Sequence, residues 1–411
     1  MERPQRHAAL SAGTTLQQAP CPLCGGQAFS PLFAAEQVPA RHIRTAGAPD
    51  VEGDFGALAI AQCDGCGHVV NAAFRSESAE HLYEVHPSTN APVHESMLRG
   101  LESIAANILG TPTSPQRILE IGCGVGALAR LLARNAACVH LIEPNLSAAD
   151  AKFGNDRISF LPGFFPAATT GERYDLVVCR QVLEHVETPL AFLKAIREHV
   201  APGGRAYVEV PSADYIIRHA SLTDFHYLHV QYFTDAVLRA MFARAGFEVT
   251  RFDSIKDGHD YGYHLIPAAP REIPWPGRAN VPTDLPRRIA ARLAAGRTRL
   301  AGLDGPVALY GACAYAQAFM GVYPDLCSAP LILDDTESYD GHEAYSRLGR
   351  LAVRKPTPEI LAELRHVVIS AWLHDSAIAA RLAALGYSGS VLSLRSDNLA
   401  GTSGHPPSLF A

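Results

Sequence analysis

The feature that most constrains the fold is a glycine-rich turn at residues 118–126, with the sequence Ile-Leu-Glu-Ile-Gly-Cys-Gly-Val-Gly. It follows an apolar run, and a second apolar run, residues 139–142, ends at Glu143. Glycine lets the backbone pass close to a ligand, and an acid that closes the next strand is typical of nucleotide pockets on parallel sheets. The pattern therefore predicts an α/β fold with a nucleotide pocket at this turn.

The spacing of the glycines narrows the choice of ligand. Dinucleotide enzymes use G-x-G-x-x-G, which aims a helix N-terminus at a pyrophosphate. Here the pattern is E-x-G-x-G-x-G, so the third glycine comes one residue early and Glu120 precedes the first. The turn suits a ligand without a pyrophosphate. The alternative is an ordinary strand-to-helix turn, because glycine-rich turns are common in α/β proteins.

The glycine turn resembles motif I of class I methyltransferases, which bind S-adenosylmethionine (SAM). Three later segments fit the same family: an apolar strand at 174–179, a helix entered at 181–186, and the Pro-Gly-Gly turn at 202–204. The resemblance implies that the turn borders the methionine and ribose of SAM and that Glu143 accepts hydrogen bonds from both ribose hydroxyls. It also implies that the stretch 161–164 lines the adenine, that Gln181 lies at the methionine end, and that His185 is structural. The implied cofactor-binding residues are Glu120, Gly122, Gly124, Gly126, Glu143, Pro144, Gly163, Phe164 and Gln181.

Composition excludes some partners. A length of 411 residues predicts two or three domains. The net charge of −6 argues against a nucleic-acid partner, because binding nucleic acid normally needs clustered Lys and Arg. No apolar run reaches the length of a membrane span, and the start lacks the apolar core of a secretory signal. We therefore expect a cytoplasmic protein without a membrane partner.

Four of the nine cysteines form two C-x-x-C turns, Cys21/Cys24 and Cys63/Cys66. Each turn is rich in glycine, so that two thiolates can converge on one metal. We expect a tetrahedral Zn²⁺ with four thiolate ligands, which leaves no open position and is therefore structural. A disulfide pairing and a redox role are the alternatives, but nothing indicates export or a thioredoxin-like strand.

Changes in composition and periodicity divide the chain. A helix is expected at 95–109, strands of a second sheet at 307–311, 331–335, 367–370 and 391–394, and a helix at 378–385. Seven arginines at 271–299 indicate a solvated helix face or, alternatively, a place for a diphosphate. The predicted domains are a disordered tail (1–20), a zinc-binding module (21–75), a SAM-dependent methyltransferase domain (76–269), a linker and connecting helix (270–300), and a C-terminal Rossmann-like α/β domain (301–411).

This order of domains, with the stretches 310–314, 334–336 and 225–233, resembles the sugar C-methyltransferases of deoxysugar biosynthesis. That family methylates a carbon of a nucleotide-linked keto sugar, and the resemblance covers nearly the whole chain from Cys21. It implies that His229 is the general base, which removes a proton from carbon beside a carbonyl. Tyr83 falls near a family tyrosine that reaches the substrate.

The chain departs from the family beside the base. The family has Glu where this chain has Leu228, and Tyr where this chain has His226. Leucine cannot orient an imidazole, so either His226 or another group does this work, or the acceptor chemistry differs. Asp224 and His226 are the further candidates for acid or orienting roles.

The sequence therefore predicts a SAM-dependent methyltransferase that C-methylates a nucleotide-linked keto sugar or a related small metabolite. An O- or N-methyltransferase of a sugar or natural product is the alternative, because Leu228 alters the acceptor site. An RNA-modifying enzyme and a non-catalytic SAM-binding protein are further hypotheses, opposed by the acidic charge and by the intact glycine turn. A monomer is compatible with the sequence, which does not specify the oligomeric state.

Overall fold

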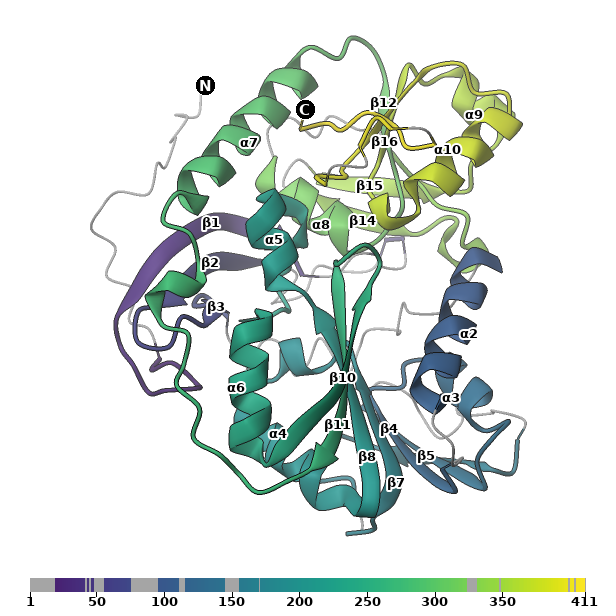
Figure 1. The fold of residues 1–411 in the computed structure, drawn as a ribbon. Coiled ribbons are helices and arrows are strands. Elements are labelled where there is room, and N and C mark those ends of the chain that lie inside the picture. The colour runs from purple at the N-terminus through teal and green to yellow at the C-terminus, as the bar shows by residue number, and fades with distance from the viewer. Residues whose placement is uncertain are drawn as a thin grey trace.

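The computed structural model describes residues 19–40, 43, 46–47, 55–74, 95–110, 115–144, 155–169, 171–323, 331–346, 349–397, 400–402 and 404–410. They contain three sheets, of seven, six and four strands. In Figure 1 the seven-stranded sheet lies below, the six-stranded sheet lies above, and the four-stranded sheet lies to one side between them. Residues 1–18 of the expected tail and Tyr83 lie outside the described residues.

The seven-stranded sheet forms the domain that carries the glycine turn. Its order is β10-β11-β8-β7-β4-β5-β6; β10 and β11 are antiparallel additions to five parallel strands. Buried apolar residues on both faces of β4, such as Ile118 and Leu119, explain its central place. The strands are β4 (Arg117–Ile121), β5 (Cys138–Glu143), β6 (Ile158–Pro162), β7 (Tyr174–Arg180), β8 (Val200–Pro211), β10 (Phe247–Ile255) and β11 (Asp260–Pro267).

Helices cover this sheet, and short segments connect it to the rest of the chain. The helix expected at 95–109 forms as α2 (Glu95–Leu109), and its apolar face packs on α3 and the sheet. The others on this sheet are α3 (Ala127–Leu132), α4 (Pro189–His199) and α6 (Asp235–Ala245). The helix α5 (Ala213–His219) packs in a separate core with β1 and α8, and 3₁₀ turns lie at Leu183–His185 and Leu222–Asp224.

The six-stranded sheet has the order β14-β15-β13-β12-β16-β17, and only the edge strand β14 runs antiparallel. All four strands expected in this region form. The strands are β12 (Val307–Tyr310), β13 (Leu331–Leu333), β14 (Glu343–Ser346), β15 (Gly349–Arg354), β16 (His366–Ile369) and β17 (Ser390–Ser393). The helices are α8 (Ala314–Val322), α9 (Pro358–Ala362) and α10 (Asp375–Ala384), with 3₁₀ turns at Glu337–Tyr339 and Trp372–His374.

The four-stranded sheet combines two distant parts of the chain. Its strands are β1 (Phe29–Pro39), β2 (Phe55–Cys63), β3 (Val69–Asn71) and β9 (Gln231–Tyr232). Val69 of β3 pairs with Tyr232 of β9, so the cysteine-bearing segment shares a sheet with the segment that comes after His229. The boundary drawn at residue 75 thus separates segments that the structure pairs.

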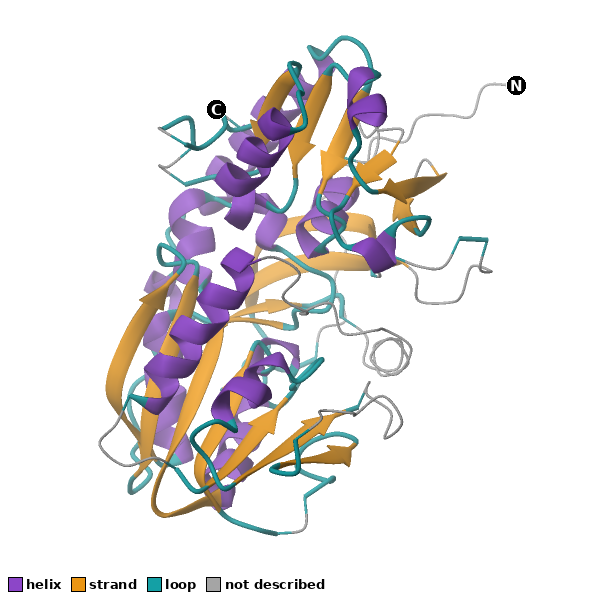
Figure 2. Ribbon diagram, turned by 90° about the vertical axis from the view of Figure 1, so that its right-hand side faces the viewer, coloured by secondary structure: helices purple, strands orange, loops and turns teal. Residues whose placement is uncertain are grey.

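The connecting segment between the two large sheets is packed rather than free. Gly277 N donates to Cys66 O at 3.2 Å, and the 3₁₀ turn Arg278–Asn280 lies beside the second cysteine turn. The helix α7 (Leu285–Ala301) then buries Leu285 and Ile289 in a core that includes residues of β1, α5 and α8. Figure 2 shows the two large sheets one above the other beside a column of helices.

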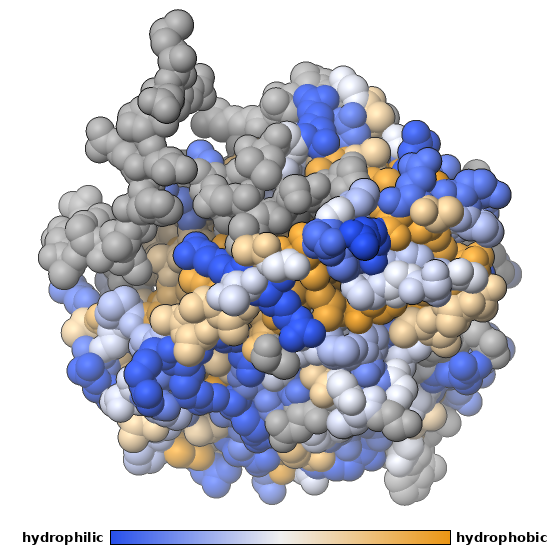
Figure 3. Space-filling view, turned by 90° about the horizontal axis from the view of Figure 1, so that it is seen from above, coloured by the Kyte–Doolittle hydropathy of each residue, from blue (hydrophilic) through white to orange (hydrophobic). Residues whose placement is uncertain are grey.

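No helix in the described ranges is long and apolar enough to cross a membrane. Seen from above, the surface shows hydrophilic side chains interspersed with hydrophobic ones (Figure 3). The expected absence of a membrane partner stays a prediction.

Candidate functional site

The glycine turn after β4 takes a shape that side chains disfavour. Gly122 and Gly124 have φ of 71° and 53°, and a Cβ on Gly122 would lie 2.3 Å from Val182 Cγ2. Gly122 N donates to Ile142 O, and Gly124 N donates to Glu143 Oε2, both at 2.8 Å. The turn and the end of β5 are thereby held together, with their backbone facing a cavity.

That cavity is large, about 1710 Å³, and most of the predicted cofactor-binding residues line it. Phe164 is 45% exposed, which places its ring at the rim. Glu120 is buried in β4, and Gly126 caps α3 with φ of 69°, so these two support the turn without lining the cavity. The lining residues of the predicted set are Gly122, Gly124, Glu143, Pro144, Gly163, Phe164 and Gln181.

Two of the nine predicted residues, one in the cavity lining and one buried behind it, have polar atoms without a partner in the described chain. Gln181 has φ of 54°, and within the described chain its buried Nε2 has no hydrogen-bond partner. Burial raises the pKa of Glu120 to about 8, and its Oε2 also lacks a partner among the described residues. An unpaired buried polar atom costs free energy that a bound ligand or water can recover.

The same cavity extends to the six-stranded sheet. Gly311, Ala312 and Tyr315, which come after β12, line it together with Asp334 at the end of β13. The carboxyl ends of parallel strands in both large sheets therefore open onto one space, where open α/β sheets place their ligands.

Between the two sheet edges lies a group of three histidines. His185 and His229 pack with ring centroids 4.8 Å apart, and His226 and His229 with centroids 4.7 Å apart. All three line the cavity. The structure thus brings the predicted base His229 and the candidate His226 together, and adds His185, for which the sequence indicates a structural role.

Burial sets the protonation of this group. It lowers the pKa of His185 and of His226 to about 4, and lowers the pKa of His229 well below its usual value. The three imidazoles are therefore neutral at pH 7, and a neutral imidazole can accept a proton. The same burial raises the pKa of the adjacent Glu184 carboxyl well above its usual range.

Glu184 completes a possible cation site. Its carboxyl is almost fully buried, and neither oxygen has a hydrogen-bond partner in the described part of the chain. Ligand atoms of Glu184, His185 and His229 all lie within 4.8 Å of one another. Such a carboxyl needs either its own proton or a cation, and two imidazoles with one carboxylate can bind a divalent metal.

Leu228 contributes its backbone where its side chain cannot act. The Leu228 carbonyl oxygen accepts a hydrogen bond at 2.9 Å from His185 Nδ1. Its side chain packs against the small cluster of Ala40 and Tyr227. Leu228, where the sequence departs from the resemblance, therefore orients a neighbouring histidine, His185, through the main chain.

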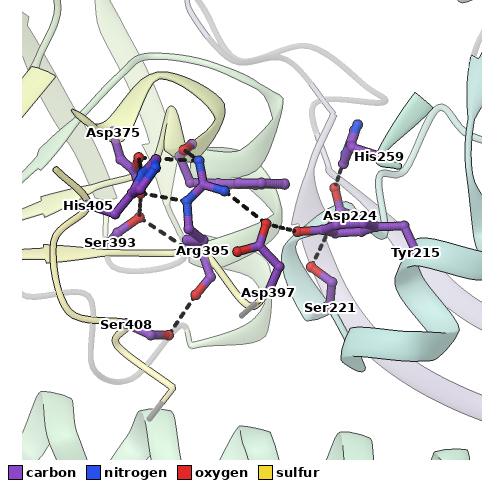
Figure 4. A network of polar contacts seen from close by, with 11 residues as sticks. Tyr215, Ser221, Asp224, His259, Asp375, Ser393, Arg395, Asp397, His405 and Ser408 are labelled. Atoms are coloured by element: carbon purple, nitrogen blue, oxygen red, sulfur yellow. Dashed lines mark hydrogen bonds and ion pairs between the residues drawn. The ribbon is translucent and has the colours of Figure 1, made fainter. Parts of the chain in front are cut away.

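Asp224 lies elsewhere in the cavity wall, in a buried chain of charges (Figure 4). His259 Nε2 lies 2.9 Å from Asp224 Oδ1, and His259 Nδ1 lies 2.6 Å from Asp260 Oδ1. Ser221 Oγ donates to Asp224, and Lys256 Nζ lies 2.6 Å from Asp260 Oδ2. Burial lowers the pKa of His259, but the charges of Asp260 and Asp224 outweigh burial and raise the pKa to about 9.

The four predicted metal ligands converge as expected for one metal. Cys21 Sγ lies 3.5 Å from Cys66 Sγ, and Cys24 Sγ lies 3.5 Å from Cys63 Sγ. All four sulfur atoms lie within 4.8 Å of one another, and Gly26 N donates to Cys24 Sγ at 3.4 Å. Four convergent thiols with amide support fit a tetrahedral metal with sulfur ligands.

The seven arginines do not reach the cavity. Arg287 pairs with Asp284 on the exposed face of α7, and Arg292 lies over the Phe410 ring. None of the seven, all of them described, is among the residues that line the cavity. The cations that do line it include Lys256, Lys355 and Arg381, so this structure favours the solvated-face interpretation of the arginine segment.

Sequence reasoning missed four residues of the site: Glu184, Lys256, His259 and Tyr315. Lys256, His259 and Asp260 lie close together in the β10–β11 turn, which extends toward the six-stranded sheet (Figure 1). The cluster of charged residues and histidine at 256–260 is the signal in the sequence that could have indicated this turn. Tyr315 lies directly after the Tyr-Gly-Ala-Cys-Ala stretch that carried the resemblance.

Comparison with known proteins identifies the central part of the chain. Residues 93–251 match the family model of a methyltransferase domain. This region is a class I SAM-dependent methyltransferase domain, and its order of strands and glycine turn agrees with that assignment.

Curated relatives match over part of their length. The ubiquinone biosynthesis O-methyltransferase of Schizosaccharomyces pombe is 31% identical over 118 residues, 27% of this chain and 43% of that protein. The protein of the same name from Psychrobacter arcticus is 30% identical over 177 residues, 38% of this chain and 65% of that protein. The chain thus spans less than half of the first relative and less than two thirds of the second.

Two solved structures show similarity at lower identity. A DhpI-SAH complex is 19% identical with a TM-score of 0.38, covering 47% of this chain and 97% of that chain. The magnesium protoporphyrin IX methyltransferase ChlM of Synechocystis, with bound SAH, is 16% identical with a TM-score of 0.38, covering 47% and 100%.

Proposed function

We propose that this protein is a SAM-dependent methyltransferase that acts on a small molecule held between its two large sheets. The single observation that carries the proposal is the continuous cavity, which joins the glycine turn of the methyltransferase domain to the carboxyl edge of the six-stranded sheet. A donor at the turn and an acceptor toward the second sheet would meet beside the three histidines.

The favoured reaction is C-methylation of a keto sugar linked to a nucleotide. His229 takes a proton from the carbon beside the carbonyl, and the resulting enolate carbon attacks the methyl group of SAM, which leaves as S-adenosylhomocysteine (SAH). Burial supports this role because it keeps the imidazole neutral at pH 7.

The far end of the cavity supports a nucleotide-linked acceptor. Lys355 and Arg381 place two cations there, beside the turn that comes after β12. Each cation forms an ion pair but stays partly exposed to solvent. Arg381 lies 3.4 Å from Asp335 and its side chain is 45% exposed, while Lys355 lies 3.7 Å from Glu337 and its side chain is 44% exposed. Exposed cations of this kind can contact phosphate oxygens.

The test uses SAM with a deuterated methyl group and a panel of nucleotide-linked keto sugars, with NMR to locate the transferred label. We expect the label on carbon, and we expect His229→Ala to lower turnover about 10²- to 10⁴-fold while SAH affinity is kept. His342→Ala, which lies outside the cavity, is the matched control. Transfer by His229→Ala at the wild-type rate would remove this histidine from the reaction.

O-methylation is the second candidate, and the Glu184, His185 and His229 group favours it. A divalent cation held there would lower the pKa of an acceptor hydroxyl, and the curated relatives are named O-methyltransferases. The same NMR experiment separates the two reactions by the position of the label. Loss of transfer with EDTA, restored by Mg²⁺ or Zn²⁺, would favour this candidate.

We also propose that the four cysteines hold one structural Zn²⁺. Metal analysis of the purified protein is expected to return about one zinc per chain, and Cys63→Ser is expected to destabilise it strongly. Cys138→Ser, outside the cluster, is the control. A folded, metal-free protein would contradict this assignment.

A further inference from the structure

Tyr315 enters the acceptor end of the cavity from the six-stranded sheet. It lies in the first turn of α8, and its ring packs against His226, with centroids 5.3 Å apart, and against Trp372, with centroids 5.6 Å apart. These two ring contacts restrict the direction of the phenol. Tyr315, His226 and His229 line the same cavity.

The phenol oxygen of Tyr315 can accept a hydrogen bond from His259, but the phenol O–H cannot donate one to it. Tyr315 Oη lies 3.5 Å from His259 Nε2. The two nitrogens of His259 already face carboxylates, Asp224 at 2.9 Å and Asp260 at 2.6 Å, so both carry protons that point at those carboxylates. A protonated Nε2 can donate to Tyr315 and cannot accept from it. The Tyr315 hydroxyl makes no other hydrogen bond within the described residues, so its O–H is left to donate into the cavity.

The surroundings also keep this phenol protonated. Burial raises the pKa of Tyr315 well above its usual value, and the charges of Asp224 and Asp260 act in the same direction. The group therefore remains an O–H donor across the physiological pH range. His259, held as a cation by its two carboxylates, lies behind it.

The wider packing holds this arrangement in place. The rings of Tyr215 and His259 pack with centroids 5.2 Å apart, and the Tyr215 hydroxyl donates a hydrogen bond to Asp397 at 2.9 Å. Arg395 in turn pairs with Asp397 and Asp375, which ties the C-terminal segment to the same wall (Figure 4). A donor fixed by packing needs no reorganisation when charge develops on a ligand.

We propose that Tyr315 is a catalytic residue that donates a hydrogen bond to the carbonyl oxygen of the acceptor, with the His259 cation behind it. This inference rests on the proposed C-methylation. When His229 removes a proton from the adjacent carbon, negative charge moves to that oxygen, and the Tyr315 O–H stabilises it without transferring its proton. The site is therefore specific for an acceptor that carries an enolisable carbonyl.

The experiment measures proton exchange without methyl transfer. The protein is saturated with SAH in D₂O, and NMR records deuterium uptake beside the carbonyl of dTDP-4-keto-6-deoxyglucose. We expect Tyr315→Phe to slow the exchange about 100-fold, as removal of one oxyanion donor does. Tyr323→Phe is the matched control, because Tyr323 is a buried tyrosine at the end of the same helix and outside the cavity.

The outcomes separate this inference from the proposed function. Calorimetry with SAH shows whether Tyr315→Phe remains folded, since its cofactor affinity should equal that of the wild type. Exchange by Tyr315→Phe at the rate of the wild type and of Tyr323→Phe would overturn the inference and leave C-methylation standing. Absence of both exchange and transfer with the wild-type protein would contradict the proposed function and this inference together.

Discussion

The turn after β4 and the turn after β12 occupy equivalent places in the two large sheets. In each, a glycine with positive φ donates at 2.8 Å to a carbonyl at the end of the neighbouring parallel strand, Gly122 to Ile142 and Gly311 to Leu333. In both turns, the residue that follows this carbonyl group in the chain is an acid, and its carboxylate accepts a hydrogen bond from a backbone amide of the turn. Glu143 accepts from Gly124 at 2.8 Å, and Asp334 accepts from Ala312 at 2.7 Å.

The two turns differ in the residues after the first glycine. The first turn continues with Gly124 and Gly126, and Gly122 and Gly124 bring backbone without side chains to the cavity. The second continues with alanine and cysteine and then Tyr315, and Asp334 also accepts from Thr336 N at 2.8 Å. The same backbone device can thus leave room for a cofactor or carry side chains into the acceptor region. Side chains, rather than the strand-turn-helix unit, distinguish the two.

The largest expected effect concerns the stability contribution of His259, which lies between the two large sheets. Its pKa of about 9 in the folded state lies above the usual 6.5, so its contribution to stability is complete below pH 6.5 and is lost as the pH rises through 9. The difference corresponds to about 3 kcal/mol. His185 and His226 have the opposite sign, because their pKa values of about 4 cost stability as the pH falls below 6.5.

Urea unfolding across pH 4 to 10 measures this difference. We expect the free energy of unfolding to fall on both sides of neutrality, and the alkaline loss to shrink in His259→Gln. A variant with the same alkaline loss as the wild type would show that His259 is not the titrating group.

The next effect compares the two acids. Glu143→Ala should weaken SAH binding about tenfold through lost hydrogen bonds, while Asp334→Ala should leave it unchanged. Asp334→Ala should instead lower stability by about 2 kcal/mol, because two amides lose their acceptor. Calorimetry with SAH and thermal unfolding measure the two quantities. Equal loss of SAH affinity in both variants would mean that the turns do not divide the work as proposed.

The smallest effect concerns the cations of the C-terminal side. Arg381→Ala should raise the KM for a nucleotide-linked acceptor about threefold, with kcat unchanged, because one exposed charge is lost. Arg287→Ala, on the solvated face of α7, is the control and should change neither constant. A larger increase in KM from Arg287→Ala than from Arg381→Ala would instead indicate that the arginine segment 271–299 binds the phosphates.

The sequence predicted several helices and strands well, because the pattern of apolar residues that favours each one lies within the segment itself. The helix at 95–109 and the four strands of the second sheet follow apolar periodicity, which depends only on neighbouring residues. The four cysteines converge as their two C-x-x-C turns indicated. Seven of the nine predicted cofactor residues line the cavity, since the glycine turn and its acid lie at fixed strand ends.

Long-range pairing could not be predicted in the same way. The pairing of β3 with β9 joins residues more than 150 positions apart, and two-residue strands such as Gln231–Tyr232 carry no periodicity. His185, whose E-H-V setting indicated a structural role, lies in the cavity because Leu228 O orients its ring. His259 and Tyr315 lie far apart in the sequence, and only the folded chain brings them to 3.5 Å.

The sequence by itself determined the glycine turn, its acid and the two C-x-x-C turns, because each depends on spacing within one segment. Only the tertiary structure decided which side chains surround the acceptor. Glu184, His229, His259 and Tyr315 come from four separate segments. Burial shifts the pKa of Glu184, His229 and Tyr315, and the charges of Asp260 and Asp224 raise the pKa of His259. Burial and charge proximity arise from the packing of distant segments, which no spacing along the chain encodes.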